Sequence, residues 1–144
     1  MRSQPDAYAL LVADVFHTAG EMRRAGEAIA GRVGQTQARW QVMSVISEGT
    51  WTVPDTARRL GITRQGVQRI ADELVKDGLA AYAENPRHRR SAFLRLTTKG
   101  SAALTKITAI AQRHNQKVMA LFSTDELMRT RDVLRRIVAA LETV

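Results

Sequence analysis

The chain has 144 residues, of which 44% are hydrophobic, 5% are aromatic and none is cysteine. This composition predicts one domain of ordinary size with an aliphatic core, and the lack of cysteine excludes disulfides, thiolate zinc sites and cysteine-based redox switches. The net charge is +8, and the segment from Arg58 to Gly100 carries +6 of it, with ten basic and four acidic side chains. No run of about 18 apolar residues occurs, so we expect a cytoplasmic protein without a membrane span.

The first predicted element is a helix from Asp6 to about Ile29, because apolar residues recur there at steps of three and four. Gly31 and Gly34 follow and end this helix, since glycine favours the left-handed backbone at a helix terminus. A second helix is expected to start after Thr36, whose hydroxyl can cap it, and to stop at Gly49.

The next segment predicts two short helices joined by a tight turn. Thr52 caps the first of them and Gly61 closes it. The second runs over 63–77, with Thr63 as its cap and Gly78 as its terminator. This succession of caps and glycines is the pattern of a helix-turn-helix.

The helix over 63–77 has two different faces when its residues are placed at about 100° steps. Its apolar residues fall on one side and must be buried, namely Val67, Ile70, Ala71 and Leu74. Its polar residues fall on the other side and are free to contact a partner, namely Gln65, Gln68, Arg69, Asp72 and Lys76.

Two short strands are predicted at 79–84 and 92–96, with residues 85–90 as the turn between them. The turn holds three arginines within four residues, Arg87, Arg89 and Arg90. Such a hairpin tip would repel itself unless an anion lay nearby. His88 between these arginines is interpreted as a solvated loop residue in preference to a pH sensor.

The last part of the chain predicts two helices, the first of which starts at its cap Thr97 and ends at about Phe122. Its apolar residues alternate at steps of three and four like a heptad seam, with His114 among them. Ser123 and Glu126 form a capping box that begins the second helix. A continuous seam needs a partner, so we expect these helices and the N-terminal one to pair two chains, with packing inside one chain as the alternative.

Positive charge is concentrated on the segment that also predicts the helix-turn-helix and the hairpin, which indicates a site for the phosphates of duplex DNA. A solvated basic face is the alternative. Because arginine and glutamine match the edges of guanine and adenine, we expect bases to be read by Gln65, Gln68 and Arg69. Arg64 would reach a base or a phosphate, and Thr63 would offer its hydroxyl to the backbone. Plain solvent exposure of the two glutamines is the alternative to base reading.

The arginines of the turn have a different expected role. We expect Arg87, Arg89 and Arg90 to contact phosphates or to enter a narrow minor groove, where the potential is most negative. Phosphate contacts of this kind would strengthen binding to any duplex sequence.

Three stretches of the central segment resemble the MarR family of winged helix-turn-helix regulators. They are Ala57–Ile70 (ARRLGITRQGVQRI), Leu74–Leu79 (LVKDGL) and, after Arg89 and Arg90, Leu94–Gly100 (LRLTTKG). The ending Leu-x-Leu-Thr-x-x-Gly after a basic wing, at this distance from the turn, is the most discriminating of them. The match extends over nearly the whole chain.

The resemblance implies a mainly α-helical fold with a small β wing, in a single domain over 1–144. Residues 36–100 would form the DNA-binding winged helix-turn-helix, and residues 6–30 and 101–144 would form dimerisation helices. It also implies a homodimer that places one recognition helix per subunit in the major groove and each wing in the flanking minor groove. Repression would be relieved by a small-molecule effector.

The resemblance further implies a ligand pocket near the first, second and fifth helices, with four candidate lining residues: Phe16, Trp40, Met43 and His114. Trp40 is alternatively a core residue, and His114 a structural histidine. One position departs from the family pattern, which usually has an aspartate two residues before a wing arginine. This chain has His88 before Arg90. The aspartate would brace the wing through a charge pair, so the bracing of this hairpin is left open.

The leading prediction is a sequence-specific DNA-binding regulator, a homodimeric repressor on an inverted-repeat operator, that uses no metal and no cofactor. Its closest rival is a sequence-indifferent winged-helix protein that organises DNA, with similar affinity for operator and random duplex. An enzyme is disfavoured, because the sequence displays no nucleophile-base-orienter trio, glycine-rich phosphate loop or metal cluster. A membrane-surface role is disfavoured, because the charge lies in a hairpin and not along one amphipathic helix.

Overall fold

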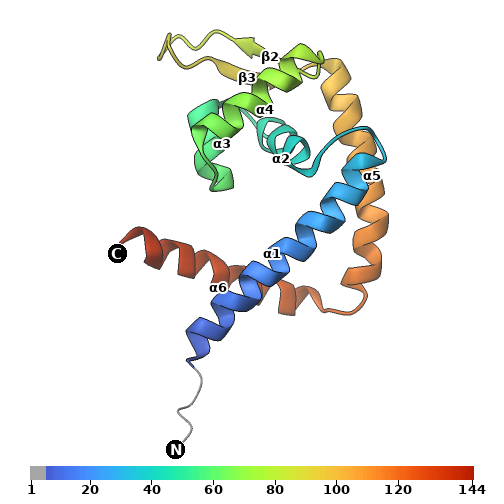
Figure 1. The fold of residues 1–144 in the computed structure, drawn as a ribbon, viewed down its shortest axis with the longest axis vertical. Helices are drawn as coiled ribbons and strands as arrows, with labels where there is room; N and C mark the ends of the chain where they lie inside the picture. Colours follow the sequence, from blue (N-terminus) through green and yellow to red (C-terminus); the bar gives the residue numbers. More distant parts are fainter. Residues whose placement is uncertain (1–5) are drawn as a thin grey trace, which may run out of the picture. The chain divides into compact units, whose positions relative to one another are not determined.

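The computed structural model describes residues 6–144, which divide into two compact units, one ending at Ala109 and the other formed by Ile110–Val144. The described residues are mainly helical with a small three-stranded sheet, which confirms the predicted fold class (Figure 1). In chain order the elements are α1 (Ala7–Gly31), α2 (Gln37–Ile46), β1 (Trp51–Thr52), α3 (Val53–Leu60), α4 (Arg64–Lys76), β2 (Ala80–Ala83), β3 (Phe93–Leu96), α5 (Thr98–Met119) and α6 (Thr124–Glu142).

The predicted helix caps are confirmed by hydrogen bonds to the first turn of each helix. The hydroxyl of Thr36 accepts from the backbone N–H of Arg39 at 3.1 Å, and that of Thr63 accepts from Gly66 at 3.0 Å. Ser123 and Glu126 form the expected capping box at the start of α6. Each bond satisfies a backbone donor that the helix itself leaves free, so these caps fix where the helices begin.

Two glycines end α3 and follow α4 in the left-handed backbone conformation. Gly61 has φ 68° and Gly78 has φ 74°, a region that residues with a Cβ atom rarely adopt. The N–H of Ile62 then bonds to the carbonyl of Ala57 at 3.1 Å, and the N–H of Leu79 to that of Leu74 at 2.8 Å. The chain therefore reverses sharply after each helix, which sets α3 against α4 and α4 against the hairpin.

The core of the first unit forms where α2, α3, α4 and the hairpin of β2 and β3 meet (Figure 1). All four residues of the predicted apolar side of α4 are buried, which confirms that face. They pack in a core whose fully buried side chains include Met43 of α2 and Leu94 of β3. Burial of this apolar side leaves the opposite, polar side of α4 facing outward.

The sheet has the order β1-β3-β2, and both strand pairs are antiparallel. Leu94 pairs with Trp51 on one side and with Tyr82 on the other. The two wing strands were predicted, although each is slightly shorter than expected. β1 was not predicted, because a two-residue strand is too short to show an alternating pattern.

The motif Leu-x-Leu-Thr-x-x-Gly joins the start of α5 to the turn after α4. The Thr97 hydroxyl donates to the carbonyl of Gly78 at 2.6 Å, and the Thr97 N–H donates to the carbonyl of Leu79 at 3.1 Å. A Cβ atom added to Gly100 would lie only 1.9 Å from the Leu79 carbonyl oxygen. Glycine is therefore required there by close backbone approach, which gives a physical reason for the motif.

In the second unit, α5 ends at Met119, three residues before the predicted end at Phe122. The N–H of Phe122 bonds to the carbonyl of Met119 at 3.1 Å, so a tight turn replaces the last helical turn. α6 contains no buried residue, and its leucines at every seventh position stay 39%, 40% and 58% exposed, namely Leu127, Leu134 and Leu141. Every helix within 6–144 is too short or too polar to traverse a lipid bilayer.

Candidate nucleic-acid interface

The polar face of α4 is exposed, as its sequence pattern predicts. Gln65, Gln68 and Arg69 all lie on the surface, and Arg64 lies at the first position of the helix. Thr63 uses a lone pair of its hydroxyl to cap the helix, so its own hydroxyl hydrogen stays available for an outside acceptor. The face thus presents glutamine amides, guanidinium groups and one hydroxyl to a partner.

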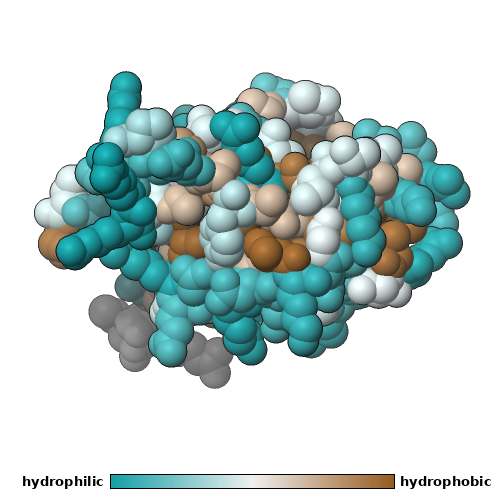
Figure 2. Space-filling model, turned by 90° about the horizontal axis from the view of Figure 1, so that it is seen from above, coloured by the Kyte–Doolittle hydropathy of each residue, from teal (hydrophilic) through white to brown (hydrophobic). Residues whose placement is uncertain are grey.

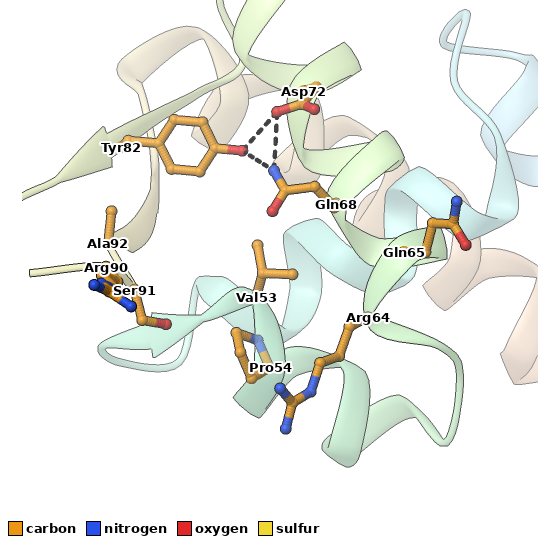
Figure 3. A pocket seen from close by; sticks show the side chains of 10 residues that line it. All are labelled: Val53, Pro54, Arg64, Gln65, Gln68, Asp72, Tyr82, Arg90, Ser91 and Ala92. Atoms are coloured by element: carbon orange, nitrogen blue, oxygen red, sulfur yellow. Dashed lines mark hydrogen bonds between the residues drawn. The ribbon is translucent and has the colours of Figure 1, made fainter. Parts of the chain in front are cut away.

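A groove of about 560 Å³ separates this face from the wing (Figure 3). Arg64, Gln65 and Gln68 line it from α4, and Arg90 lines it from the wing. The remaining lining residues are Val53, Pro54, Asp72, Tyr82, Ser91 and Ala92. The structure therefore brings four predicted DNA-binding residues together around one hollow.

The other predicted residues lie outside this groove. Arg87 and Arg89 are exposed in the turn of the hairpin. Arg69 lines a second hollow, of about 480 Å³, together with Gln65 and Gln68. In Figure 2 hydrophilic side chains stand out from the surface, with hydrophobic residues in the hollows between them.

Gln68 is held by a closed set of three hydrogen bonds that links α4 to the wing (Figure 3). Its Nε2 donates to Asp72 Oδ1 at 3.0 Å and to the Tyr82 hydroxyl at 2.7 Å. The Tyr82 hydroxyl in turn donates to Asp72 Oδ1 at 2.8 Å. Asp72 and Tyr82 therefore fix the position of a predicted base-reading side chain.

The protonation of Tyr82 follows from its surroundings. Burial of the phenol, its hydrogen bond to Asp72 and the negative charge of that carboxylate raise the pKa of Tyr82 to about 12, against the effect of the Gln68 hydrogen bond. The phenol accordingly keeps its proton at neutral pH. It can therefore donate to Asp72 whenever the protein is in ordinary buffer.

Asn85 supplies the wing brace that the sequence left open. This residue is only 5% exposed, and its Nδ2 donates to the carbonyl of Ser91 across the turn at 3.0 Å. Its Oδ1 accepts from the N–H of Arg87 at 3.2 Å, and its carbonyl accepts from the N–H of His88 at 3.2 Å. The turn is thus closed by a neutral amide, where the family pattern leads one to expect a charge pair.

The four candidate ligand-lining residues differ in exposure. Met43 is fully buried, Trp40 is half-buried, Phe16 is 75% exposed and His114 is exposed. Their role toward a ligand stays a prediction. No group of three or more His, Asp or Glu side chains within 6–144 is placed to hold a metal ion.

Sequence reasoning missed the roles of Asp72, Tyr82 and Asn85. Asp72 lies four residues after Gln68 on one helix, a spacing at which glutamine and aspartate side chains meet, so that contact was available from the sequence. Asn85 precedes a proline in a turn, and asparagine commonly bonds to its own turn backbone. Tyr82 had no such local signal, because its partners lie ten and fourteen residues away.

The sequence and the fold of this chain both match known proteins. The MarR family model matches residues 34–91. An uncharacterized protein of Mycobacterium tuberculosis, Rv2011c, is 51% identical over 137 residues, which cover 95% of this chain and 96% of the relative. The crystal structure of MarR family transcription regulator SP03579 matches with a TM-score of 0.73 at 26% identity, over 96% of this chain and 99% of that one.

Two further solved structures share the fold at 20% identity. A mutant of MarR from E. coli complexed with operator DNA has a TM-score of 0.75, with 94% of this chain and 99% of that chain covered. MarR of Staphylococcus aureus in complex with salicylate and kanamycin has a TM-score of 0.74, with 94% and 95% covered. On the family model and the structural match to regulator SP03579, the chain belongs to the MarR family of winged helix-turn-helix transcription regulators.

Proposed function

We propose that the protein is a sequence-specific DNA-binding regulator that acts in the cytoplasm as a homodimeric repressor. The observation that carries this proposal is the groove between the polar face of α4 and the wing, which four basic or amide side chains line from both sides. It lies in the segment that holds +6 of the net charge of +8. A duplex strand in this groove would have α4 on its major-groove side and the wing on its minor-groove side.

Each side chain then has a definite role. Gln65, Gln68 and Arg69 face the base edges of the major groove, where amide and guanidinium groups distinguish adenine and guanine. Arg64 reaches a base or a phosphate, and Thr63 donates its hydroxyl hydrogen to the DNA backbone. The wing arginines add contacts that do not depend on sequence, through phosphates or the minor groove, namely Arg87, Arg89 and Arg90.

The pairing of two chains is proposed from the terminal helices. α6 buries none of its residues in one chain, although leucine recurs along it at every seventh position. Such a face is covered when two copies pair. Residues 6–30 and 101–144 would then form the dimer, and each 36–100 segment would bind one half of an inverted-repeat operator, with half-sites roughly 34 to 36 Å apart.

Two solved structures of related fold support the partners we propose. The E. coli relative is complexed with operator DNA, and the Staphylococcus aureus relative is in complex with salicylate and kanamycin. We propose by analogy that this protein binds an operator and that a small molecule releases it. Repression is the proposed direction, because a dimer seated on an operator excludes other proteins from that duplex.

Selection of duplexes from a random pool by the purified protein tests the proposal. A palindromic motif, bound at matched salt at least about 10³-fold more tightly than random duplex, is the expected outcome. Recovery of no motif, or equal affinity for selected and random duplex, would support a sequence-indifferent DNA-organising protein instead.

A further inference from the structure

Gln68 is the only one of the proposed base-reading residues for which the described structure records hydrogen bonds by the side chain. A glutamine amide has two N–H donors and one carbonyl acceptor. The Nε2 nitrogen lies 3.0 Å from Asp72 Oδ1 and 2.7 Å from the Tyr82 hydroxyl, and we assign one of its two hydrogens to each of these contacts. No hydrogen bond among residues 6–144 uses the carbonyl oxygen, and Figure 3 shows that oxygen pointing away from Asp72 and Tyr82, into the groove.

The orientation of this amide follows from chemistry. An ionised carboxylate only accepts hydrogen bonds, so the atom 3.0 Å from Asp72 Oδ1 must be the nitrogen of Gln68. Turning the amide over would set two acceptor oxygens against each other. Tyr82 reinforces this choice, because its hydroxyl gives its hydrogen to Asp72 and must therefore accept from Gln68.

We infer that Asp72 and Tyr82 make Gln68 an acceptor-only reader, which selects bases that carry an amino group in the major groove. This inference rests on the proposed function. Adenine offers its N6 amino group and cytosine its N4 amino group, whereas guanine and thymine present acceptors at the corresponding positions. Gln68 would therefore favour adenine or cytosine, and would make no use of adenine N7. A free glutamine, by contrast, pairs with adenine through both N6 and N7.

Tyr82 is thus a positioning residue for specificity, although it lies on the wing strand β2 and not on α4. The same hydrogen bonds link β2 to α4, so the orientation of the Gln68 amide depends on where the hairpin lies against α4.

The first step of the test identifies the base that Gln68 reads. Duplexes are selected with the wild-type protein, with Gln68→Ala and with the control Gln65→Ala, which alters a neighbouring exposed amide. The position that loses its preference only in Gln68→Ala is assigned to Gln68. The wild type should favour adenine or cytosine over guanine or thymine there by about 2- to 12-fold, the contribution of one hydrogen bond.

The second step uses two base analogues in a duplex with adenine at the assigned position. Replacement by 7-deazaadenine, which lacks N7, should leave wild-type affinity unchanged. Replacement by purine, which lacks the N6 amino group, should weaken wild-type binding by about 2- to 12-fold and leave Gln68→Ala unaffected. Tyr82→Phe releases one Nε2 hydrogen, so this variant should become sensitive to the loss of N7.

The outcomes separate this inference from the proposed function. If the wild type selects no motif, the proposed function fails. If it selects a motif but prefers guanine or thymine at the assigned position, or loses affinity on 7-deazaadenine, only the acceptor-only inference is overturned. The same holds if Gln68→Ala changes no position, or if Tyr82→Phe remains insensitive to N7.

Discussion

Residues 36–100 bury most of their apolar side chains, whereas α6 buries none of its own. In the winged helix-turn-helix, the apolar side of α4 lies in a closed core, and the polar side carries the amide and guanidinium groups. In α6 the leucines at every seventh position are 39–58% exposed. The winged helix-turn-helix thus forms a core within one chain and exposes its charged side chains. By contrast, α6 exposes apolar side chains to solvent.

This difference indicates that the two regions are stabilised in different ways. The winged helix-turn-helix depends on caps, close backbone contacts and a core that one chain supplies. Within one chain, α6 is stabilised by its own backbone bonds, its capping box and local ion pairs such as Arg136 with Asp132 at 3.7 Å. Substitutions in the first region should therefore act on folding or DNA binding, and substitutions on the apolar face of α6 should act on assembly.

The largest expected effect is on assembly. Leu134→Arg removes one buried leucine from each chain of the proposed dimer, at about 1.5–3 kcal/mol each, so the dimer should weaken by about 3–6 kcal/mol. This corresponds to an increase in the dissociation constant of about 10²- to 10⁴-fold, which sedimentation equilibrium measures. Arg136→Ala, about 200° around the same helix, is the control. An unchanged dissociation constant for Leu134→Arg would place the interface elsewhere.

The next effect concerns the charge of the wing. Replacing Arg87, Arg89 and Arg90 together by alanine removes three phosphate contacts, which should lower affinity about 100-fold near 0.15 M salt and reduce the slope of log K against log salt by about 2.7 per subunit. Binding measured over a salt series gives both quantities. Replacement of the three by lysine keeps the charge and should keep the slope. If the triple alanine variant kept the wild-type dependence of log K on log salt, the three arginines would not contact phosphates.

A stability effect of about 1–3 kcal/mol, or more, is expected for Gly100→Ala. The new Cβ atom would lie 1.9 Å from the Leu79 carbonyl oxygen, so the backbone of α5 or of the turn after α4 must move. Urea unfolding measures the loss. Gly31→Ala is the matched control, because a Cβ atom there meets nothing within 4 Å. Equal stability of the two variants would show that the close contact between α5 and the turn is absent in solution.

The smallest effect is expected for the wing brace. Asn85→Ala removes the bonds to the Ser91 carbonyl and the Arg87 N–H and should cost about 0.5–1.5 kcal/mol for each bond lost, chiefly as loosening of the hairpin. Amide hydrogen exchange of Arg87, which loses its acceptor, should become faster. His88→Ala serves as control, because its side chain is exposed and only its backbone takes part in the brace. Faster exchange in the control alone would assign the bracing to His88.

Much of the winged helix-turn-helix could be predicted, because its signals are local. Thr36, Thr63 and Ser123 act as caps through atoms within three residues of them, and the two faces of α4 follow from helical periodicity. β1 could not be predicted, because two residues show no period. Tyr82 was also out of reach, because its contact with Gln68 depends on how the hairpin lies against α4 and not on any spacing within one element.

The candidate site was predictable in its residue types but not in its hydrogen bonding. The basic and amide residues of α4 and the wing were identified from charge and periodicity. The direction of the Gln68 amide depends on two partners, one visible at a helical spacing and the other on a different strand. The apolar seam predicted along α5 is likewise only partly buried in one chain. Ile107 and Ala111 are buried, whereas Val118 is 47% exposed.

The junction made by Thr97, Lys99 and Gly100 has a mechanical consequence. Two hydrogen bonds from Thr97 and one of 3.0 Å from the Lys99 ammonium to the Asp77 carbonyl tie the first turn of α5 to the segment that ends α4. These bonds and the close contact of Gly100 with the Leu79 carbonyl fix the first turn of α5 against the end of α4, so we expect the two helices to move together. In the dimer proposed above, α5 would act as a lever arm, so that a change at its far end would alter the distance between the two α4 helices without disturbing the packing around either of them.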